Sequence, residues 1–123
     1  MVKVLFDTNI LIDYLNGVED AAREIGRYSD KAISLITWME VMAGATAGDE
    51  RVIKAFLAQF ELLPIDSAVS TEAVAIRRTR KVKLPDAIIL ATARTGGRIF
   101  ITRNTKDFPA GVDADIRMPY RTP

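Results

Sequence analysis

Short apolar runs alternate along the chain with longer stretches in which apolar residues recur at helical spacing. The apolar runs predict buried β-strands at residues 2–6, 31–36, 61–65 and 98–102, and a late, short one at 115–118. The periodic stretches predict helices at residues 9–15, 19–28, 37–45, 50–60, 67–81 and 85–95. Pro64 predicts that the third strand ends there or lies at a sheet edge. This alternation favours an α/β fold, a three-layer sandwich with a mostly parallel central sheet flanked by helices.

Composition narrows the chemistry that such a fold can carry. The 123 residues suit one domain, spanning 1–123. The chain has neither His nor Cys, which excludes Ser-His-Asp triads, histidine bases, thiolate zinc sites and thiol nucleophiles. The formal net charge is only +1, so nucleic-acid binding would need a local basic patch. The N-terminus does not resemble a signal peptide, and no apolar run approaches the roughly 20 residues of a membrane span. We therefore expect a cytoplasmic protein without membrane contact.

Four acidic residues lie near the points where predicted strands end and helices or turns begin: Asp7, Glu40, Asp86 and Asp107. In an α/β sheet such positions gather in one crevice beyond the carboxyl ends of the strands. Two carboxylates about 5 Å apart repel by roughly 3 kcal/mol at an effective dielectric of 20. A divalent cation would remove that cost, and Mg²⁺ prefers oxygen ligands. The pattern therefore predicts a metal site and metal-assisted chemistry.

Each acid also has an ordinary structural explanation. Asp7 suits the N-cap of the first helix, and Glu40 fits a capping box that begins at Thr37. Asp86 follows a proline at a helix start, where negative charge suits the helix dipole, and Asp107 lies in a turn-like stretch. Further acids are expected on helix surfaces without a special role: Asp13, Glu19, Glu24, Asp49 and Glu72.

Four segments taken in order resemble the motifs of PIN-domain ribonucleases. They are Asp7-Thr8-Asn9-Ile10-Leu11-Ile12-Asp13, Ile36-Thr37-Trp38-Met39-Glu40-Val41, residues 84–93 around Asp86, and residues 101–108. Their order, their spacing and the chain length are similar to those of the small VapC-type toxins of bacterial toxin–antitoxin pairs. The resemblance covers nearly the whole chain. It implies a PIN-like fold and a Mg²⁺- or Mn²⁺-dependent endoribonuclease.

The resemblance also implies roles for individual residues. Asp7 and Asp86 would be the principal metal ligands, and Glu40 would complete the acidic cluster directly or through water. Many family members carry an Asp just after the Thr of the fourth strand, where this chain has Thr102 followed by Arg103 and Asn104. The fourth catalytic position therefore stays open between Asn104 and Asp107. The residues Thr8, Asn9 and Thr102 would support the site, although local capping explains Thr8 and Asn9 equally well.

Basic residues near these motifs are candidates for contact with RNA. Arg103 and Lys106 lie in the fourth motif, and Arg80 and Lys83 precede the third. A solvated helix end is the alternative explanation for Arg80 and Lys83. The resemblance further implies a homodimer and a cognate VapB-like antitoxin, whereas the RNA target and the number of metal ions stay open.

Two other classes of protein compete with this interpretation. A haloacid-dehalogenase-like phosphatase would use Asp7 as its nucleophile, but such enzymes usually need a second Asp where this chain has Asn9. A catalytically degenerate module that binds RNA or protein is the other alternative, and Asn104 keeps it open.

Overall fold

The computed structural model describes residues 1–109 and 113–121, and these form five strands and six helices. Every predicted element is present. The strands are β1 (Lys3–Phe6), β2 (Asp30–Ser34), β3 (Glu61–Leu63), β4 (Ile99–Ile101) and β5 (Ile116–Arg117). The helices are α1 (Thr8–Leu15), α2 (Glu19–Gly26), α3 (Leu35–Ala43), α4 (Glu50–Leu57), α5 (Ser67–Thr79) and α6 (Leu84–Thr95).

The strands form one sheet in the order β3-β2-β1-β4-β5, and all pairings between the described strands are parallel. The predicted parallel sheet is therefore confirmed. β3 lies at an edge and ends at Leu63, as Pro64 predicts. The chain moves outward from β1 in one direction through β2 and β3, and in the other direction through β4 and β5. The strand order thus reverses between β1 and β4, and a crevice opens at such a reversal beyond the carboxyl ends of the strands.

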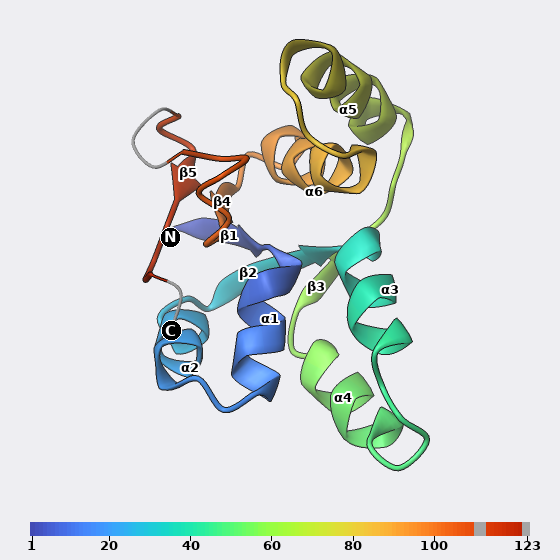
Figure 1. Cartoon of the computed structure of the whole chain (residues 1–123), viewed down its shortest axis with the longest axis vertical. Helices are drawn as coiled ribbons and strands as arrows, with labels where there is room; N and C mark the ends of the chain where they lie inside the picture. The colour runs from blue at the N-terminus through green and yellow to red at the C-terminus, as the bar shows by residue number, and fades with distance from the viewer. Residues whose placement is uncertain (110–112, 122–123) are drawn as a thin grey trace.

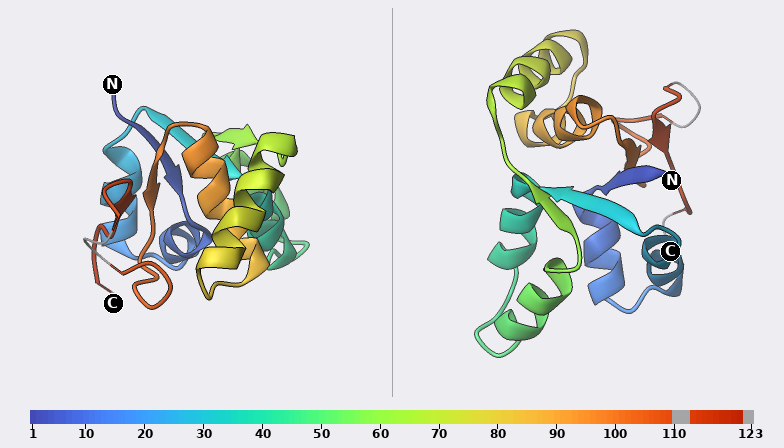
Figure 2. Two further views of the ribbon diagram at one scale, coloured as in Figure 1. Left: turned by 90° about the horizontal axis from the view of Figure 1, so that it is seen from above. Right: turned by 180° about the vertical axis from the view of Figure 1, so that it is seen from behind.

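Helices cover both faces of the sheet and make a three-layer sandwich. Helices α5 and α6 lie on one face and α1 to α4 on the other (Figures 1 and 2). Strand residues alternate between the two cores: Leu5 packs toward α5 and α6, whereas Val4 and Phe6 pack toward the other face. The same alternation places Phe100 in the first core and Ile101 in the second. Burial on both faces explains why β1 from Val4 onward and the whole of β4 are apolar, whereas β2 begins with Asp30 and Lys31.

β2 ends and α3 begins earlier in the chain than the sequence pattern predicts. The predicted strand extends to Ile36, but β2 ends at Ser34, whose side chain accepts a hydrogen bond from the Ile36 amide (3.0 Å) and caps α3. Ser at an N-cap satisfies an otherwise unpaired helical amide, and this overrides the β propensity of Leu35 and Ile36. The capping box proposed for Thr37 and Glu40 is therefore wrong.

The end of the sheet opposite the crevice is held by a buried arginine. Arg98, just before β4, donates to the Asp30 carboxylate (2.8 Å) and to the Val4 carbonyl (3.2 Å), and it approaches Glu61 (3.5 Å). One side chain thus joins the starts of four strands and leaves the other end of the sheet open for chemistry. Within the described residues, no helix is both long enough and apolar enough to cross a membrane.

Candidate active site

Asp7 is the anchor of the candidate site at the end of β1. Its Oδ1 accepts from the Thr8 amide (2.8 Å), which caps α1, and its Oδ2 accepts from the Thr102 hydroxyl (2.7 Å) and the Asn9 amide group (3.3 Å). The predicted N-cap is thus present, but the same carboxylate also faces the crevice and is only 5% exposed. Capping and a functional role are therefore compatible at this residue.

The charge state of Asp7 reflects a competition between burial and hydrogen bonds. Burial raises the pKa of its carboxyl to about 6, although the hydrogen bonds from Thr102 and Thr8 act in the opposite direction. The negative charges of Asp86 and Glu40 contribute to this rise in the pKa. Such a site gains free energy when a positive charge arrives beside Asp7.

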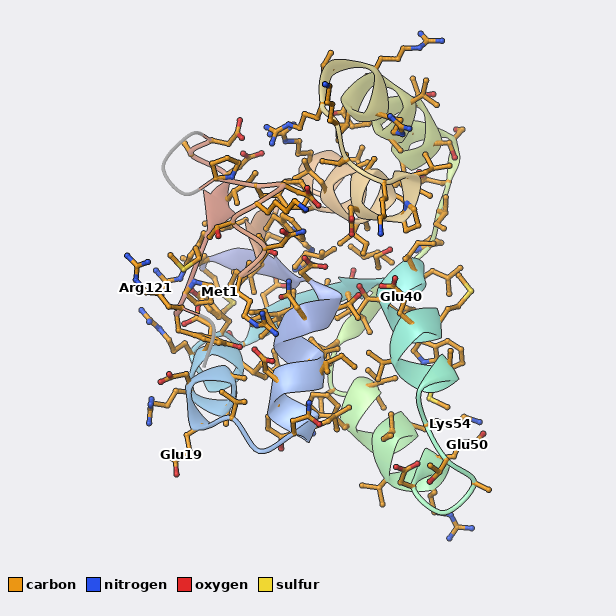
Figure 3. All side chains as sticks on the ribbon, in the orientation of Figure 1. Met1, Glu19, Glu40, Glu50, Lys54 and Arg121 are labelled. Carbon is orange, nitrogen blue, oxygen red and sulfur yellow. The ribbon has the colours of Figure 1, made fainter. Side chains whose placement is uncertain are left out.

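Glu40 reaches the same crevice from α3. Its Oε1 accepts a short hydrogen bond from the Thr8 hydroxyl (2.6 Å), and that hydroxyl also bonds with the Thr37 hydroxyl (2.9 Å). Thr37 is fully buried, whereas Glu40 is exposed. Figure 3 shows Glu40 on α3, the helix that follows β2. Thr8 therefore orients Glu40. This contact, and not a capping box, explains why the Glu40 carboxylate lies where it does.

Asp86 comes from the first turn of α6, which follows the N-cap residue Lys83 and has a proline at its start. Its carboxyl is half-buried and interacts electrostatically with neighbouring acids. Burial raises the pKa of its carboxyl, as do Asp107 and Glu40, whereas Lys83 lowers it. The helix N-terminus favours a negative charge there, as the capping explanation requires, yet the neighbouring acids disfavour it.

The disputed fourth position is shared by two residues. The Thr102 hydroxyl accepts a hydrogen bond from the backbone amide of Asn104 (3.0 Å), and the Asn104 side chain lines the crevice. The Asn104 amide group donates to Asp107 Oδ2 (3.0 Å), and the Asp107 backbone amide donates back to Asn104 Oδ1 (3.2 Å). Asp107 is not among the described residues that line the crevice. Of the two residues, only Asn104 is in this described lining, whereas Asp107 binds Asn104 and lies close enough to Asp86 to raise the pKa of its carboxyl.

These side chains surround a cleft of about 330 Å³, which we call the acidic cleft. Its described lining consists of Asp7, Thr8, Asn9, Ile12, Glu40, Asp86, Arg103 and Asn104. Carboxylate, amide and hydroxyl oxygens dominate this donor set, as a hard divalent cation requires. In the described part of the chain, however, no three acids come close enough to share one ion as they stand. The donor set thus fits a divalent cation in its chemistry, whereas the spacing of the described acids does not by itself form a site of three carboxylates.

The four candidate RNA contacts differ in their surroundings. Arg103 lines the acidic cleft, and its Nε and Nη2 bind the carboxylate of Asp13 (2.6 and 3.0 Å). Arg80 forms an ion pair with Asp113 and lies over the Phe108 ring at 6.0 Å. Lys83 and Lys106 are exposed, and neither is among the residues that line the acidic cleft. Arg103 is therefore the candidate that the fold brings into the site.

Two of the acids expected on helix surfaces are in fact buried. Asp13 is 5% exposed and accepts from Arg103 and from the Tyr120 hydroxyl (2.8 Å), while Glu24 is 3% exposed and binds Arg117. Although burial opposes ionisation of Asp13, these hydrogen bonds lower its pKa. Asp13 follows Asn9 by four residues and so shares its helix face. That spacing and the place of Asp13 at the end of the first PIN-like motif were the signals in the sequence that tied it to the site.

Comparisons with known proteins find relatives over nearly the whole chain. A family model described as the PIN domain matches residues 4–110. The tRNA(fMet)-specific endonuclease VapC of Shigella flexneri is 32% identical over 120 residues, covering 88% of this chain and 91% of that protein. A toxin–antitoxin complex from Klebsiella pneumoniae contains a chain that is 45% identical with a TM-score of 0.91, covering 98% and 100% of the two chains. DNA-bound VapBC from Salmonella typhimurium gives 26% identity and a TM-score of 0.78, covering 95% and 98%.

The chain belongs to the PIN-domain family. Within it, the chain is a VapC-type endonuclease toxin of a toxin–antitoxin system, and thus a hydrolase. These matches bear out the family, the fold and the enzyme class predicted from the four sequence motifs. They leave the phosphatase and the non-catalytic module without support. The assignment of individual site residues rests on the geometry above and is taken further as a proposal.

Proposed function

We propose that the chain hydrolyses RNA phosphodiester bonds with one or more Mg²⁺ or Mn²⁺ ions held by Asp7 and Asp86. Glu40 would complete the site directly or through water. The observation that carries this proposal is the buried Asp7 carboxyl, whose pKa is raised to about 6 by burial and by the charges of Asp86 and Glu40. A cation bound between the acids offsets their repulsion and keeps all of them ionised at neutral pH.

The bound ion would supply Lewis acidity, which lowers the pKa of a coordinated water and stabilises charge on the phosphate. The chain's own residues would orient the acids for an in-line attack. Thr102 and the Thr8 amide fix both oxygens of Asp7, and the Thr8 hydroxyl fixes Glu40. Glu40, the exposed acid in the described lining of the cleft, would position the attacking water. Asn104, oriented by Asp107, supplies a neutral oxygen at the fourth position.

The relatives support a substrate class and a partner. The Shigella flexneri VapC is specific for a transfer RNA. We extend this class of substrate to the chain as a proposal, without the particular transfer RNA. The Klebsiella pneumoniae structure is a toxin–antitoxin complex, and we propose a cognate VapB-like antitoxin for this chain too. Formation of a homodimer stays a prediction, which sedimentation of the purified protein tests.

Cleavage of a transfer-RNA pool by the purified chain tests the proposed function. We expect cleavage with Mg²⁺ or Mn²⁺, none in EDTA, and none from the variants Asp7→Asn or Asp86→Asn. The matched control is Asp20→Asn, because Asp20 is a half-exposed acid on α2 that pairs with Arg23 outside the acidic cleft. Cleavage that persists in EDTA, or that is unchanged in Asp7→Asn, contradicts the mechanism.

A further inference from the structure

A second pocket adjoins the acidic cleft and carries the opposite charge. It has a volume of about 260 Å³ and is lined by Arg103, Thr105, Met118 and Arg121, which we call the arginine pocket. No carboxylate is among the described residues of this lining. Arg103 also lines the acidic cleft, so the two hollows share a wall. A negatively charged group that leaves the acidic cleft past Arg103 therefore enters a basic pocket.

The shared wall is held in place by a buried carboxylate. Asp13 binds the Arg103 guanidinium through both of its oxygens, and the Tyr120 hydroxyl donates to the same carboxylate (2.8 Å). The Arg103 backbone amide also donates to Asn9 Oδ1 (3.4 Å). A guanidinium fixed in this way is preorganised, because little side-chain entropy remains to be lost when an anion binds. Asp13 and Tyr120 thus act as positioning residues for the pocket.

Arg121 is the second arginine of the pocket, and it adds a positive charge that is not paired with Asp13. Arg121 is exposed, and Figure 3 shows it on the opposite side of α1 from Glu40. The lining adds a hydroxyl from Thr105 and an apolar wall from Met118. Arginine is suited to planar, bidentate contacts with phosphate oxygens, and a thioether packs well against a ribose or a base. The chemistry of the pocket is that of a phosphate subsite.

We propose that the arginine pocket binds an RNA phosphate that flanks the scissile one, with Arg121 as its principal contact. This inference rests on the proposed function, since it takes the acidic cleft as the place of cleavage. An acidic protein segment is the rival occupant of a basic pocket. RNA is favoured because Arg103 joins the pocket to the acidic cleft, so that successive phosphates of one strand can occupy both.

Binding of uncleaved RNA tests the pocket independently of catalysis. In an Asp7→Asn background with EDTA, the affinity for a fluorescent single-stranded oligoribonucleotide is measured by anisotropy at several KCl concentrations. Adding Arg121→Gln is expected to raise Kd by about threefold to tenfold and to reduce the salt slope by about 0.7. The matched control is Arg51→Gln, because Arg51 is an exposed arginine on α4 beside Glu50 and Lys54, which Figure 3 places at the far end of the molecule.

Kinetics separate this inference from the proposed function. In the active protein, Arg121→Gln is expected to raise KM by a similar factor and to leave kcat unchanged, while Arg51→Gln changes neither. If the wild-type protein shows no metal-dependent cleavage, the proposed function is refuted. The binding experiment still tests whether the arginine pocket binds RNA. The inference is overturned if Arg121→Gln and Arg51→Gln bind RNA equally well. It is also overturned if Arg121→Gln weakens only the complex with the antitoxin.

Discussion

Replacing Asp7 by Asn is expected to stabilise the metal-free protein while abolishing its activity. Burial and the charges of Asp86 and Glu40 raise the pKa of Asp7 from 3.8 to about 6. This difference corresponds to about 3 kcal/mol by which the ionised carboxylate disfavours folding at neutral pH. Asn has the same shape without the charge, but it gives up the hydrogen bonds that Thr102 and Asn9 donate to Oδ2, together worth about 2 kcal/mol. The net gain is about 1 kcal/mol, or about 4 °C in Tm for a chain of this length.

The gain should depend on pH in a defined direction. Below about pH 4 Asp7 is protonated in the folded and the unfolded chain, so the substitution removes no charge. As pH rises from about 4 to 6, the unfolded chain loses this proton while the folded chain keeps it, and the wild type loses stability relative to the variant. Above pH 6 the full difference is present.

Urea denaturation in EDTA, followed by circular dichroism at pH values from 4 to 8, measures this difference directly. The matched control is Asp20→Asn, which should show little change at any pH because Asp20 is half-exposed. Adding Mg²⁺ at pH 7.5 should stabilise the wild type and leave Asp7→Asn unaffected. A variant that is less stable than the wild type at pH 7.5, or a difference that does not change with pH, would refute the reasoning.

Three further predictions concern the surroundings of the site. Asp86→Asn should lower kcat/KM for RNA by about 100-fold or more, whereas Asp107→Asn, which acts through its hydrogen bonds to Asn104 and its charge near Asp86, should lower it by less than about tenfold. Equal losses would contradict the assigned roles. Asp13→Asn and Glu24→Gln should both lower Tm, but only Asp13→Asn should weaken RNA binding, which is measured by anisotropy. An equal effect of the two variants on RNA binding would contradict the proposal that Asp13 positions Arg103. Ser34→Ala should cost about 1 kcal/mol in urea denaturation with unchanged cleavage per folded molecule, since it removes the α3 cap.

The sequence predicts the elements well because their apolar spacing follows directly from burial. The run ending at Phe6 and the Asp that follows predict both β1 and the place of the acid, since Val4, Leu5 and Phe6 are all fully buried. Glu40 was also placed near the site, from the pattern of acids and from the second motif, and a capping box was the alternative explanation for it. Its capping explanation failed because Ser34 caps α3 one turn earlier and frees Glu40 for the contact with Thr8.

Contacts between residues far apart in the chain could not be predicted in this way. Asp13 meets Arg103 and Tyr120 across separations of 90 and 107 residues, and no local pattern encodes such a meeting. A carboxylate on a helix looks like a surface residue until the fold supplies its partner. The choice between Asn104 and Asp107 has the same origin, because it depends on the turn that Thr102 fixes after β4.

Direct measurement of metal binding tests the central claim, which is that the acidic cleft holds a catalytic divalent cation. Mn²⁺ titrated into the purified protein and followed by electron paramagnetic resonance reports the number and affinity of bound ions. We predict saturable binding to the wild type and to Asp20→Asn at neutral pH, with binding weakened by about tenfold or more in Asp7→Asn and in Asp86→Asn. Equal Mn²⁺ binding by all four proteins, or no binding by the wild type in the presence of RNA, would contradict the account.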